Sequence, residues 1–326
     1  EAEMRAIRIE RHGGPEVMTL ADTDEPSPGP HEIRVRHHAI GVNFIDTYHR
    51  GGLYKIALPS GLGMEAAGIV EAVGEGVTRF KVGDRAAYCT APLGAYSEAH
   101  VLPESRAALL PAKIDFDIAA AGLLKGATAR FLLRKTFRVE PGHWVLIHAA
   151  AGGVGQILVQ WAKHLGANVI ATAGSEEKAE IARRLGADHA LVIRGEQNFA
   201  PRVRALVKEG VHVVYDGVGK DTWDASLDSL RPLGMMVSFG NASGSPPAVS
   251  PLVLSQKGSL FLTRPTLFHY TATAEQLDET AADLFDVLAK GAVIIAPPTA
   301  YALADAAQAH RDLEARNTTG SLVLKP

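Results

Sequence analysis

A glycine-rich segment carries the strongest chemical signal of the sequence: His148-Ala149-Ala150-Ala151-Gly152-Gly153-Val154-Gly155. It follows an apolar run typical of a strand and precedes a pattern typical of a helix. Aligned with the dinucleotide-binding fingerprint, Ala150, Gly152 and Gly155 take its three small-residue positions, with alanine replacing the first glycine. Gly152 would admit a pyrophosphate close to the backbone, and the helix N-terminus would supply amide donors. The alternative, a tight turn that binds nothing, is disfavoured by the strand–helix alternation that follows.

The end of the next expected strand bears on the choice of cofactor, and it reads Ala171-Thr172-Ala173-Gly174-Ser175-Glu176-Glu177-Lys178. Sheets that bind NAD usually place an acidic residue at this strand end, about 20 positions after the glycines. Here the strand ends at Ala173, and the two glutamates fall in the first turn of the next helix, where carboxylates suit the dipole. Gly174 leaves room for a 2′-phosphate, Ser175 can donate to it, and Lys178 can reach back as a cation. The segment predicts NADPH over NADH; alternatively, Ser175 only caps the helix and Lys178 is a surface charge.

Length and composition limit the number of domains, the class of protein and the partners that are to be expected. The chain has 326 residues, which suggests two domains. Hydrophobic residues make up 47% and charged residues 21%, an ordinary globular balance, and the net charge of −3 argues against nucleic acid or an anionic membrane as the main partner. No run approaches a membrane span and no signal peptide is evident, so we expect a cytoplasmic protein.

The first third is rich in strands and turns. Alternating apolar and charged residues at 4–9 and 32–36, and further β-like runs at 70–74 and 85–88, predict half-buried strands. Proline- and glycine-rich stretches separate them. This pattern favours a small irregular antiparallel barrel over a βαβ array.

A different pattern begins near residue 117, with helices expected at 117–124 and 127–135. From Trp144 short apolar strands alternate with amphipathic helices, which specifies a doubly wound parallel sheet. We expect strands at 144–148, 168–173, 190–193, 211–216, 235–240 and 259–263, and helices at 153–165, 176–185, 201–208 and 221–230. The tail, with helices at 275–290 and 303–315 and a strand at 321–324, is expected to rejoin the first domain. The domains are therefore 1–125 with 265–326, and 126–264.

Several segments in order along nearly the whole chain carry a family resemblance. Besides the glycine loop they are Gly41-Val42-Asn43-Phe44-Ile45-Asp46-Thr47-Tyr48, Gly61-Leu62-Gly63-Met64-Glu65-Ala66-Ala67-Gly68, Leu124-Lys125-Gly126-Ala127-Thr128, Val237-Ser238-Phe239-Gly240-Asn241 and Thr263-Arg264-Pro265. The chain resembles the zinc-free, ζ-crystallin-like quinone oxidoreductases of the medium-chain dehydrogenase/reductase superfamily, and the bacterial NADPH:quinone reductases in particular. The resemblance implies an α/β fold with a GroES-like irregular β-barrel catalytic domain and a Rossmann nucleotide-binding domain.

Zinc-dependent members of that superfamily place a metal-binding cysteine where this chain has Asn43, and a histidine where it has Met64. Neither an amide nor a thioether is a normal zinc ligand. Cys89 is the only cysteine, so a four-cysteine lobe cannot form, and its strand position suggests a packed residue. We therefore expect no metal.

The resemblance also implies site residues. Asn43 and Tyr48 would line the nicotinamide end of the cleft with Tyr54 nearby, Asn43 orienting the nicotinamide or donating to a quinone oxygen. The alternatives are a loop cap for Asn43 and core packing for the tyrosines. Glu65 is interpreted as a buried structural carboxylate, and Asp46 is assigned no role. The remaining implied cofactor contacts are Thr128, Phe239, Gly240, Asn241, Thr266 and Leu267, with Arg316 at the 2′-phosphate.

One departure affects the adenosine phosphate. The bacterial relatives often carry a tyrosine where this chain has Ile193, followed by Arg194. Arg194 either compensates by charge, since guanidinium suits phosphate, or is an ordinary surface arginine.

Without a metal to polarise a carbonyl, an electron-poor acceptor such as a quinone is the favoured substrate. The chain is predicted to transfer hydride from NADPH to a small quinone. Two alternatives remain: an α,β-unsaturated ketone or alkene as acceptor, or an NADPH-binding protein with a crystallin-like or RNA-binding role. No G-x-S-x-G elbow supports a hydrolase. The apolar strand at 259–263 is an expected sheet edge, and such edges are usually paired or covered. The resemblance implies that two of these edges pair into a continuous sheet, so we expect a homodimer.

Overall fold

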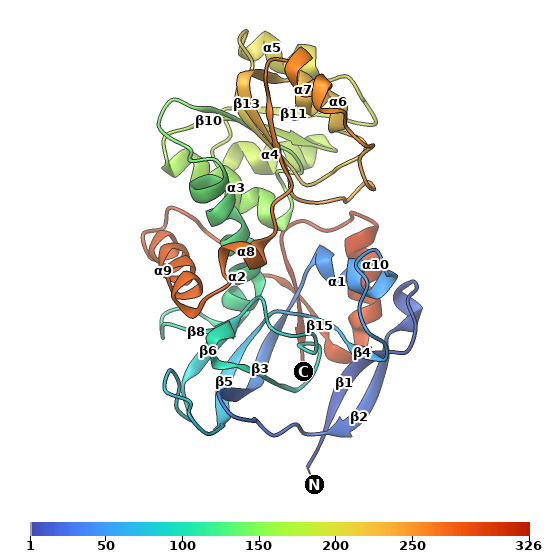
Figure 1. Ribbon diagram of the computed structural model, residues 1–326, viewed down its shortest axis with the longest axis vertical. Coiled ribbons are helices and arrows are strands. Elements are labelled where there is room, and N and C mark those ends of the chain that lie inside the picture. Colours follow the sequence, from blue (N-terminus) through green and yellow to red (C-terminus); the bar gives the residue numbers. More distant parts are fainter. Residues whose placement is uncertain (1) are drawn as a thin grey trace. The chain divides into compact units, whose positions relative to one another are not determined.

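A computed structural model describes residues 2–326, and its contacts group the chain into two compact units (Figure 1). The first unit holds the residues up to Lys125, Thr271–Ala282 and Ile295–Pro326; the second holds Gly126–Tyr270 and Asp283–Ile294. Residues 265–270 and 283–294 thus group with the second unit, where the sequence analysis had placed them in the first domain. The Tyr270 ring stacks on Phe131 at 4.4 Å, and Asp283 pairs with Arg130 at 2.9 Å, which anchors both segments to one helix of that unit.

The first unit is built mainly from antiparallel strands. A three-stranded sheet has the order β2-β1-β4, with β1 at Glu3–Ile9, β2 at Thr19–Asp24 and β4 at Ser60–Gly61. A seven-stranded sheet has the order β15-β16-β3-β5-β6-β8, with β7 also pairing with β3. Its strands are β3 (Glu32–Val42), β5 (Ala66–Val73), β6 (Arg85–Tyr88), β7 (Ala99–Pro103), β8 (Ala107–Leu109), β15 (Thr299–Ala302) and β16 (Leu322–Lys325). The last strand of the chain, β16, therefore lies beside β3, and only the β15–β16 pair is parallel.

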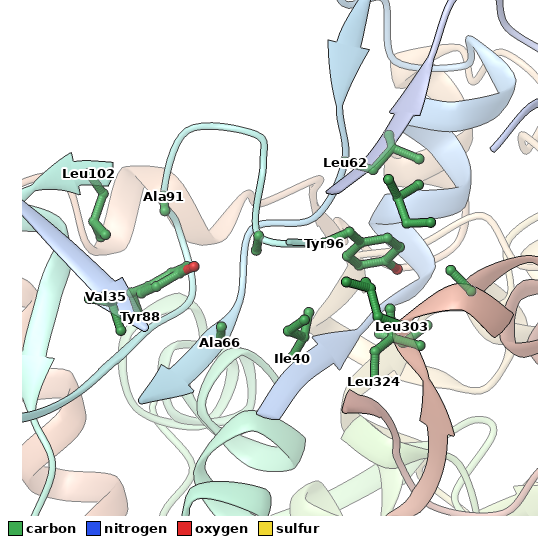
Figure 2. Packing of buried hydrophobic residues seen from close by; sticks show 14 of the residues in the cluster. Val35, Ile40, Leu62, Ala66, Tyr88, Ala91, Tyr96, Leu102, Leu303 and Leu324 are labelled. Atoms are coloured by element: carbon green, nitrogen blue, oxygen red, sulfur yellow. The ribbon is translucent and has the colours of Figure 1, made fainter. Parts of the chain in front are cut away.

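The core of the first unit fills the space between these sheets and two helices, α1 (Phe44–Gly51) and α10 (Ala306–Glu314). Period-two burial along β3 sends Ile33 and Val35 inward, both fully buried. Figure 2 shows Ile40, Tyr96 and Leu324 converging from β3, the 91–98 loop and β16 on one apolar cluster. Residues far apart in sequence thus pack α10 against the barrel, whereas the buried residues of α1, Asp46, Thr47 and Arg50, are polar.

The second unit is a six-stranded parallel sheet with the order β11-β10-β9-β12-β13-β14. The strands are β9 (Trp144–Ile147), β10 (Asn168–Ala173), β11 (His189–Val192), β12 (Val211–Asp216), β13 (Leu230–Ser238) and β14 (Phe261–Thr263). The helices among them are α3 (Gly153–His164), α4 (Glu176–Arg184), α5 (Ala200–Leu206), α6 (Trp223–Asp228), α7 (Pro251–Gln256) and α8 (Leu267–Tyr270). This architecture, with the barrel unit, confirms the predicted fold class.

The helix that joins the two patterns of the sequence, near residue 117, differs from its prediction. The two helices expected at 117–124 and 127–135 are one continuous helix, α2 (Phe116–Phe131), followed by a π-helical turn at Leu132–Thr136. Gly126 does not break the helix, because its missing side chain admits Leu284 of α9 (Ala274–Ala289): a Cβ there would lie 2.5 Å from the leucine. Across residues 2–326, no helix combines the length and apolarity that crossing a bilayer requires.

Candidate active site

The glycine loop leaves β9 in a strained turn. Ala149 has a left-handed φ of 50°, which alanine adopts only at a cost, and the amide of Gly152 donates to the Ala149 carbonyl at 3.0 Å. Gly152 then caps α3, whose first amides have no acceptor within the helix. The turn therefore presents the amides of Gly153, Val154 and Gly155 at the carboxyl end of the central strand, where a phosphate could bind.

Gly155 is required by packing. A Cβ at this position would lie 2.2 Å from the Ala149 carbonyl oxygen and 2.7 Å from Cα of Ala150. Real Cβ atoms do not approach backbone so closely, so α3 can pack on the loop only because residue 155 is glycine. Ala150, in the place of the first fingerprint glycine, is fully buried and donates its amide to Thr172 at 3.1 Å.

The end of β10 carries no carboxylate. Gly174 is exposed, and a Cβ there would meet nothing within 4 Å. The Oγ of Ser175 caps α4 by accepting a hydrogen bond from the Lys178 amide at 3.2 Å, as the capping alternative expects. Its own hydroxyl hydrogen remains able to donate to a ligand. Glu176, in the first turn of α4, pairs with Arg183 at 2.5 Å.

The neighbouring strand places Ile193 and Arg194 beside that end. The Ile193 amide donates to the Ala173 carbonyl at 2.8 Å, and Arg194 follows as an exposed side chain. Ile193 has no hydroxyl to offer a ligand beside the end of β10. The guanidinium of Arg194 is the polar side chain that follows it.

A buried hydrogen-bonded chain lies under the loop, and the sequence analysis missed it. His148, the residue before the strained alanine, bonds Thr172 through Nδ1 at 2.7 Å and Ser226 through Nε2 at 2.8 Å. Ser226 donates to Oδ2 of Asp216 at 2.7 Å, so its oxygen must accept from Nε2–H of His148. Nδ1 then accepts from Thr172, and burial lowers the pKa of the histidine, which keeps it neutral.

The remaining predicted contacts of this unit lie on three segments. Phe239 follows β13, and its amide donates to the Asp216 carbonyl at 2.9 Å. A Cβ on Gly240 would lie 2.7 Å from the Gly217 carbonyl, so the ends of β12 and β13 meet closely there. Asn241 comes next and is half-buried, Thr128 is buried in α2, and Thr266 is exposed just before Leu267 opens α8.

In the first unit, Asn43 directly follows β3 and is the N-cap of α1, where it forms a capping box with Asp46. Its amide N–H donates to Oδ2 of Asp46 at 2.9 Å. The side chain of Asn43 also donates through Nδ2 to Oε1 of Glu65 at 2.9 Å and accepts at Oδ1 from Nζ of Lys125 at 2.9 Å. The three side chains form a buried row. The cap alternative thus describes part of what Asn43 does, and its contact with a nicotinamide or a quinone stays a prediction.

The charges in this row are strongly perturbed. Burial raises the pKa of Glu65 to about 7, an effect that Lys125, Asn43 and the Leu124 amide oppose. Burial also lowers the pKa of Lys125, against the pull of two carboxylates. Gly41 makes space for the Glu65 carboxylate, since a Cβ there would lie 2.3 Å from Oε1. Glu65 is buried, as the sequence analysis expected; Lys125 was missed, although a lysine within the apolar run of residues 118–129 was a usable signal.

The two predicted tyrosines lie together beyond Asn43. Tyr48 is in α1, and Tyr54 follows the helix, with ring centroids 5.2 Å apart in an edge-to-face arrangement. The Tyr54 amide donates to the Tyr48 carbonyl at 3.2 Å, which fixes this short turn. Both side chains are only half-buried, so neither is a plain core residue. Arg316, expected at the 2′-phosphate, lies exposed between α10 and β16 with a left-handed φ of 58°.

Cys89 is fully buried, and burial raises the pKa of its thiol, so it is no nucleophile at neutral pH.

Comparison with known proteins gives consistent matches. Residues 29–112 match the family described as alcohol dehydrogenase GroES-like domain, and residues 153–287 match the one described as zinc-binding dehydrogenase. A quinone oxidoreductase of Pseudomonas aeruginosa is 54% identical over 99% of each chain. The crystal structure of Escherichia coli quinone oxidoreductase complexed with NADPH superimposes with a TM-score of 0.96, at 47% identity and complete coverage of both chains. A 2-haloacrylate reductase of a Burkholderia species is 46% identical over 98% of each chain.

Zinc, which one of these family names implies, does not fit the residues present. The Asn43 amide is committed to Glu65 and Lys125, and Met64 offers a thioether. Within residues 2–326, no group of three or more histidine, cysteine, aspartate or glutamate side chains is placed to hold a metal ion. A dinucleotide does fit, because the open space at Gly174 and the amides at the start of α3 lie at the ends of adjacent strands. Near-complete coverage at high identity leaves one assignment: the chain belongs to the quinone oxidoreductases of the medium-chain dehydrogenase/reductase superfamily.

Proposed function

We propose that this chain is an NADPH-dependent quinone reductase that works without a metal. Relatives named quinone oxidoreductase support the reaction, and the E. coli structure complexed with NADPH supports the cofactor. The observation that carries the choice of cofactor is the end of β10, where Gly174 is open and no carboxylate stands to repel a 2′-phosphate. The second unit is proposed as the NADPH-binding domain and the first as the catalytic domain.

NADPH, when bound, supplies the hydride. In this proposal the first amides of α3 hold the pyrophosphate, and Ser175, Lys178 and Arg316 hold the 2′-phosphate. Thr128, Phe239, Gly240, Asn241, Thr266 and Leu267 are proposed to seat the nicotinamide and its ribose.

Asn43 is proposed to contact the quinone that accepts the hydride. Hydride addition to a quinone leaves an aromatic hydroquinone anion, and a fixed N–H donor lowers the barrier by stabilising the developing oxyanion. Asn43 Nδ2 is such a donor, and Tyr48 and Tyr54 offer aromatic faces and hydroxyls for stacking or donation.

The test is NADPH consumption with 1,4-benzoquinone against an enone of similar size and against 2-haloacrylate. Faster turnover of the quinone is expected. The 46% identical 2-haloacrylate reductase makes alkene reduction the second candidate, and faster turnover of either alkene would replace the first.

We also propose a homodimer in the cytoplasm. Strand β14 is the edge of the parallel sheet, and Phe261 on it is 57% exposed. A paired edge would cover this ring and complete the ladder. Sedimentation is expected to show a dimer at micromolar concentration, and a monomer there would refute the pairing.

A further inference from the structure

The amide of Asn43 is held with a defined orientation. A lysine ammonium can only donate, so the atom that faces Lys125 at 2.9 Å must be Oδ1. Nδ2 therefore faces Glu65, to which it gives one of its two hydrogens. The second Nδ2 hydrogen is the one Asn43 can give to a ligand. Were the amide reversed, two donors would face each other at Lys125 and two acceptors at Glu65.

Glu65 holds this orientation best as a carboxylate. Its Oε1 accepts from Asn43 at 2.9 Å and its Oε2 accepts from the Leu124 amide at 2.6 Å. Both oxygens act as acceptors, and an ionised oxygen is the stronger acceptor. The hydrogen bonds thus favour the ionised form, while burial favours the neutral one, and Lys125 is the first of the groups that pull the pKa of Glu65 down.

Lys125 also connects the row to the backbone of β3. Besides Asn43, its ammonium donates to the Val42 carbonyl at 3.3 Å, so one side chain of α2 holds the last residue of β3 and the residue after it. The facing charged groups are Glu65 and Asp46, both fully buried. Lys125 therefore supplies a donor and a positive charge, and the two roles can be separated by substitution.

We propose that Lys125 and Glu65 are positioning residues for hydride transfer: together they set the Asn43 amide with an Nδ2 hydrogen toward the acceptor, and the positive charge of Lys125 favours the carboxylate form of Glu65 that holds this setting. The role rests on the proposed function, because Asn43 is the group proposed to touch the acceptor.

The first arm of the test compares Lys125→Met, Lys125→Arg and Lys163→Met in NADPH:benzoquinone turnover. Lys163 is a matched control, since it too donates to one backbone carbonyl and one side chain, here those of Ala167 and Asp188. We expect Lys125→Met to lower kcat by about 10- to 100-fold, the scale of a misplaced reacting group, with NADPH affinity within about twofold of the wild type. Lys163→Met should leave kcat unchanged.

The pH profile separates positioning from simple structural support. Removing the cation raises the pKa of Glu65, so the carboxylate forms only at higher pH. The kcat of Lys125→Met should therefore recover as pH rises, while Lys125→Arg, which keeps the charge, should retain the wild-type profile. A kcat within about twofold of wild type in Lys125→Met, or a pH-independent loss, overturns the proposal. If Lys125→Met does not fold, Lys125→Arg and Glu65→Gln test the proposal instead. Lys125→Arg should keep the wild-type dependence of kcat on pH, and Glu65→Gln should lose that pH dependence and most of kcat.

A second arm does not depend on quinone reduction. Difference infrared spectroscopy of the carboxylic-acid C=O band, assigned with Glu65→Gln, reports the ionisation of Glu65 in the wild type and in Lys125→Met. A larger protonated fraction of Glu65 in Lys125→Met than in the wild type at neutral pH supports the proposal, and equal bands in both proteins overturn it. A wild type that leaves benzoquinone unreduced would defeat the proposed function, while this arm would still decide the Lys125–Glu65 relationship.

Discussion

The hydroxyl of Tyr96 donates to Oδ2 of Asp46 at 2.6 Å, and this bond ties the 91–98 loop to the start of α1. Arg50 can only donate, so the Nδ1 of His310 that it contacts at 2.8 Å must accept. His310 then carries its hydrogen on Nε2 and donates it to Tyr96 at 2.9 Å. Asp46 also accepts the Asn43 amide, so the hydrogen bonds from His310 through Tyr96 and the bond from the backbone of Asn43 meet at one carboxylate.

Tyr96→Phe should destabilise the protein through these hydrogen bonds. The substitution leaves the fully buried His310 without an acceptor for Nε2–H and leaves Asp46 with one donor fewer. A buried group left unsatisfied costs about 1–3 kcal/mol, so thermal unfolding should shift down by several degrees. Tyr301→Phe is the matched control, because the Tyr301 hydroxyl donates to Asp312 at 2.5 Å near the surface. Equal shifts in the two variants would contradict this arrangement of hydrogen bonds.

Gly155→Ala should disrupt the nucleotide loop. Its Cβ would lie 2.2 Å from a backbone oxygen that cannot move without distorting the turn at Ala149. Overpacking of this kind costs about 1–3 kcal/mol, and NADPH affinity, measured by fluorescence titration, should fall as well.

Gly174→Ala is the paired control for stability. Gly174 has open space around it and no left-handed φ, so the free energy of unfolding should change by less than about 0.5 kcal/mol. A tolerated Gly155→Ala, or a destabilising Gly174→Ala, would show that the packing at the two positions is misdescribed.

Buried histidines should make the protein less stable in acid. Burial lowers the pKa of six of them: His37 and His310 to about 3, His212 to about 4, and His49, His100 and His148. His37, His310 and His212 thus take up protons between about pH 6.5 and pH 4 mainly in the unfolded chain, and the lowered pKa of the other three acts in the same direction, so stability falls as pH drops. Glu65 and Asp46, with pKa values raised to about 7 and about 6, act in the opposite sense but are only two.

The free energy of unfolding, from urea titrations, should therefore rise between pH 4 and pH 6. His37→Phe removes one of these groups, so its slope against pH should be shallower than that of the wild type. A flat or falling curve for the wild type would show that the histidines are not held neutral.

The parallel sheet was predictable because its strands are buried on both faces and read as continuous apolar runs. The expected strand at 168–173 coincides with β10, and the expected strand at 144–148 is one residue longer than β9. The edge strands β2 and β15 were missed, since most of their residues are exposed and the apolar signal is weak.

Helix α1 was missed for a different reason. Its buried side chains include Asp46 and Arg50, whose partners Tyr96, His310 and Glu314 lie 50 to 264 residues away. The row at Asn43 is equally non-local, because Glu65 and Lys125 come from separate elements. Periodicity identifies apolar faces, but it carries no information about which distant polar groups satisfy each other.

Lys178→Ala should weaken NADPH binding and spare NADH. Lys178 lies in the first turn of α4, one turn from the Ser175 cap, where a cation can contact the 2′-phosphate of NADPH. NADH lacks this phosphate, so its binding does not depend on the lysine. Paired calorimetric titrations with the two cofactors measure the difference. Arg184→Ala, at the far end of the same helix, is the control and should leave both affinities unchanged. Equal losses for NADPH and NADH in Lys178→Ala would show that the lysine does not read the phosphate.

His148→Phe should weaken NADPH binding beyond its effect on stability. The substitution removes the bonds to Thr172 and Ser226 that hold the residue preceding the left-handed Ala149, so the glycine loop loses its fixed conformation. His37→Phe is a matched control: His37 is equally buried and bonded, to the Ser97 carbonyl and the Tyr88 hydroxyl, but it lies in the barrel unit. Both variants should lower the unfolding temperature by similar amounts, because each breaks two buried hydrogen bonds. Only His148→Phe should raise the Kd for NADPH, and a similar rise in His37→Phe would mean that the affinity follows overall stability and not the support that His148 gives the loop.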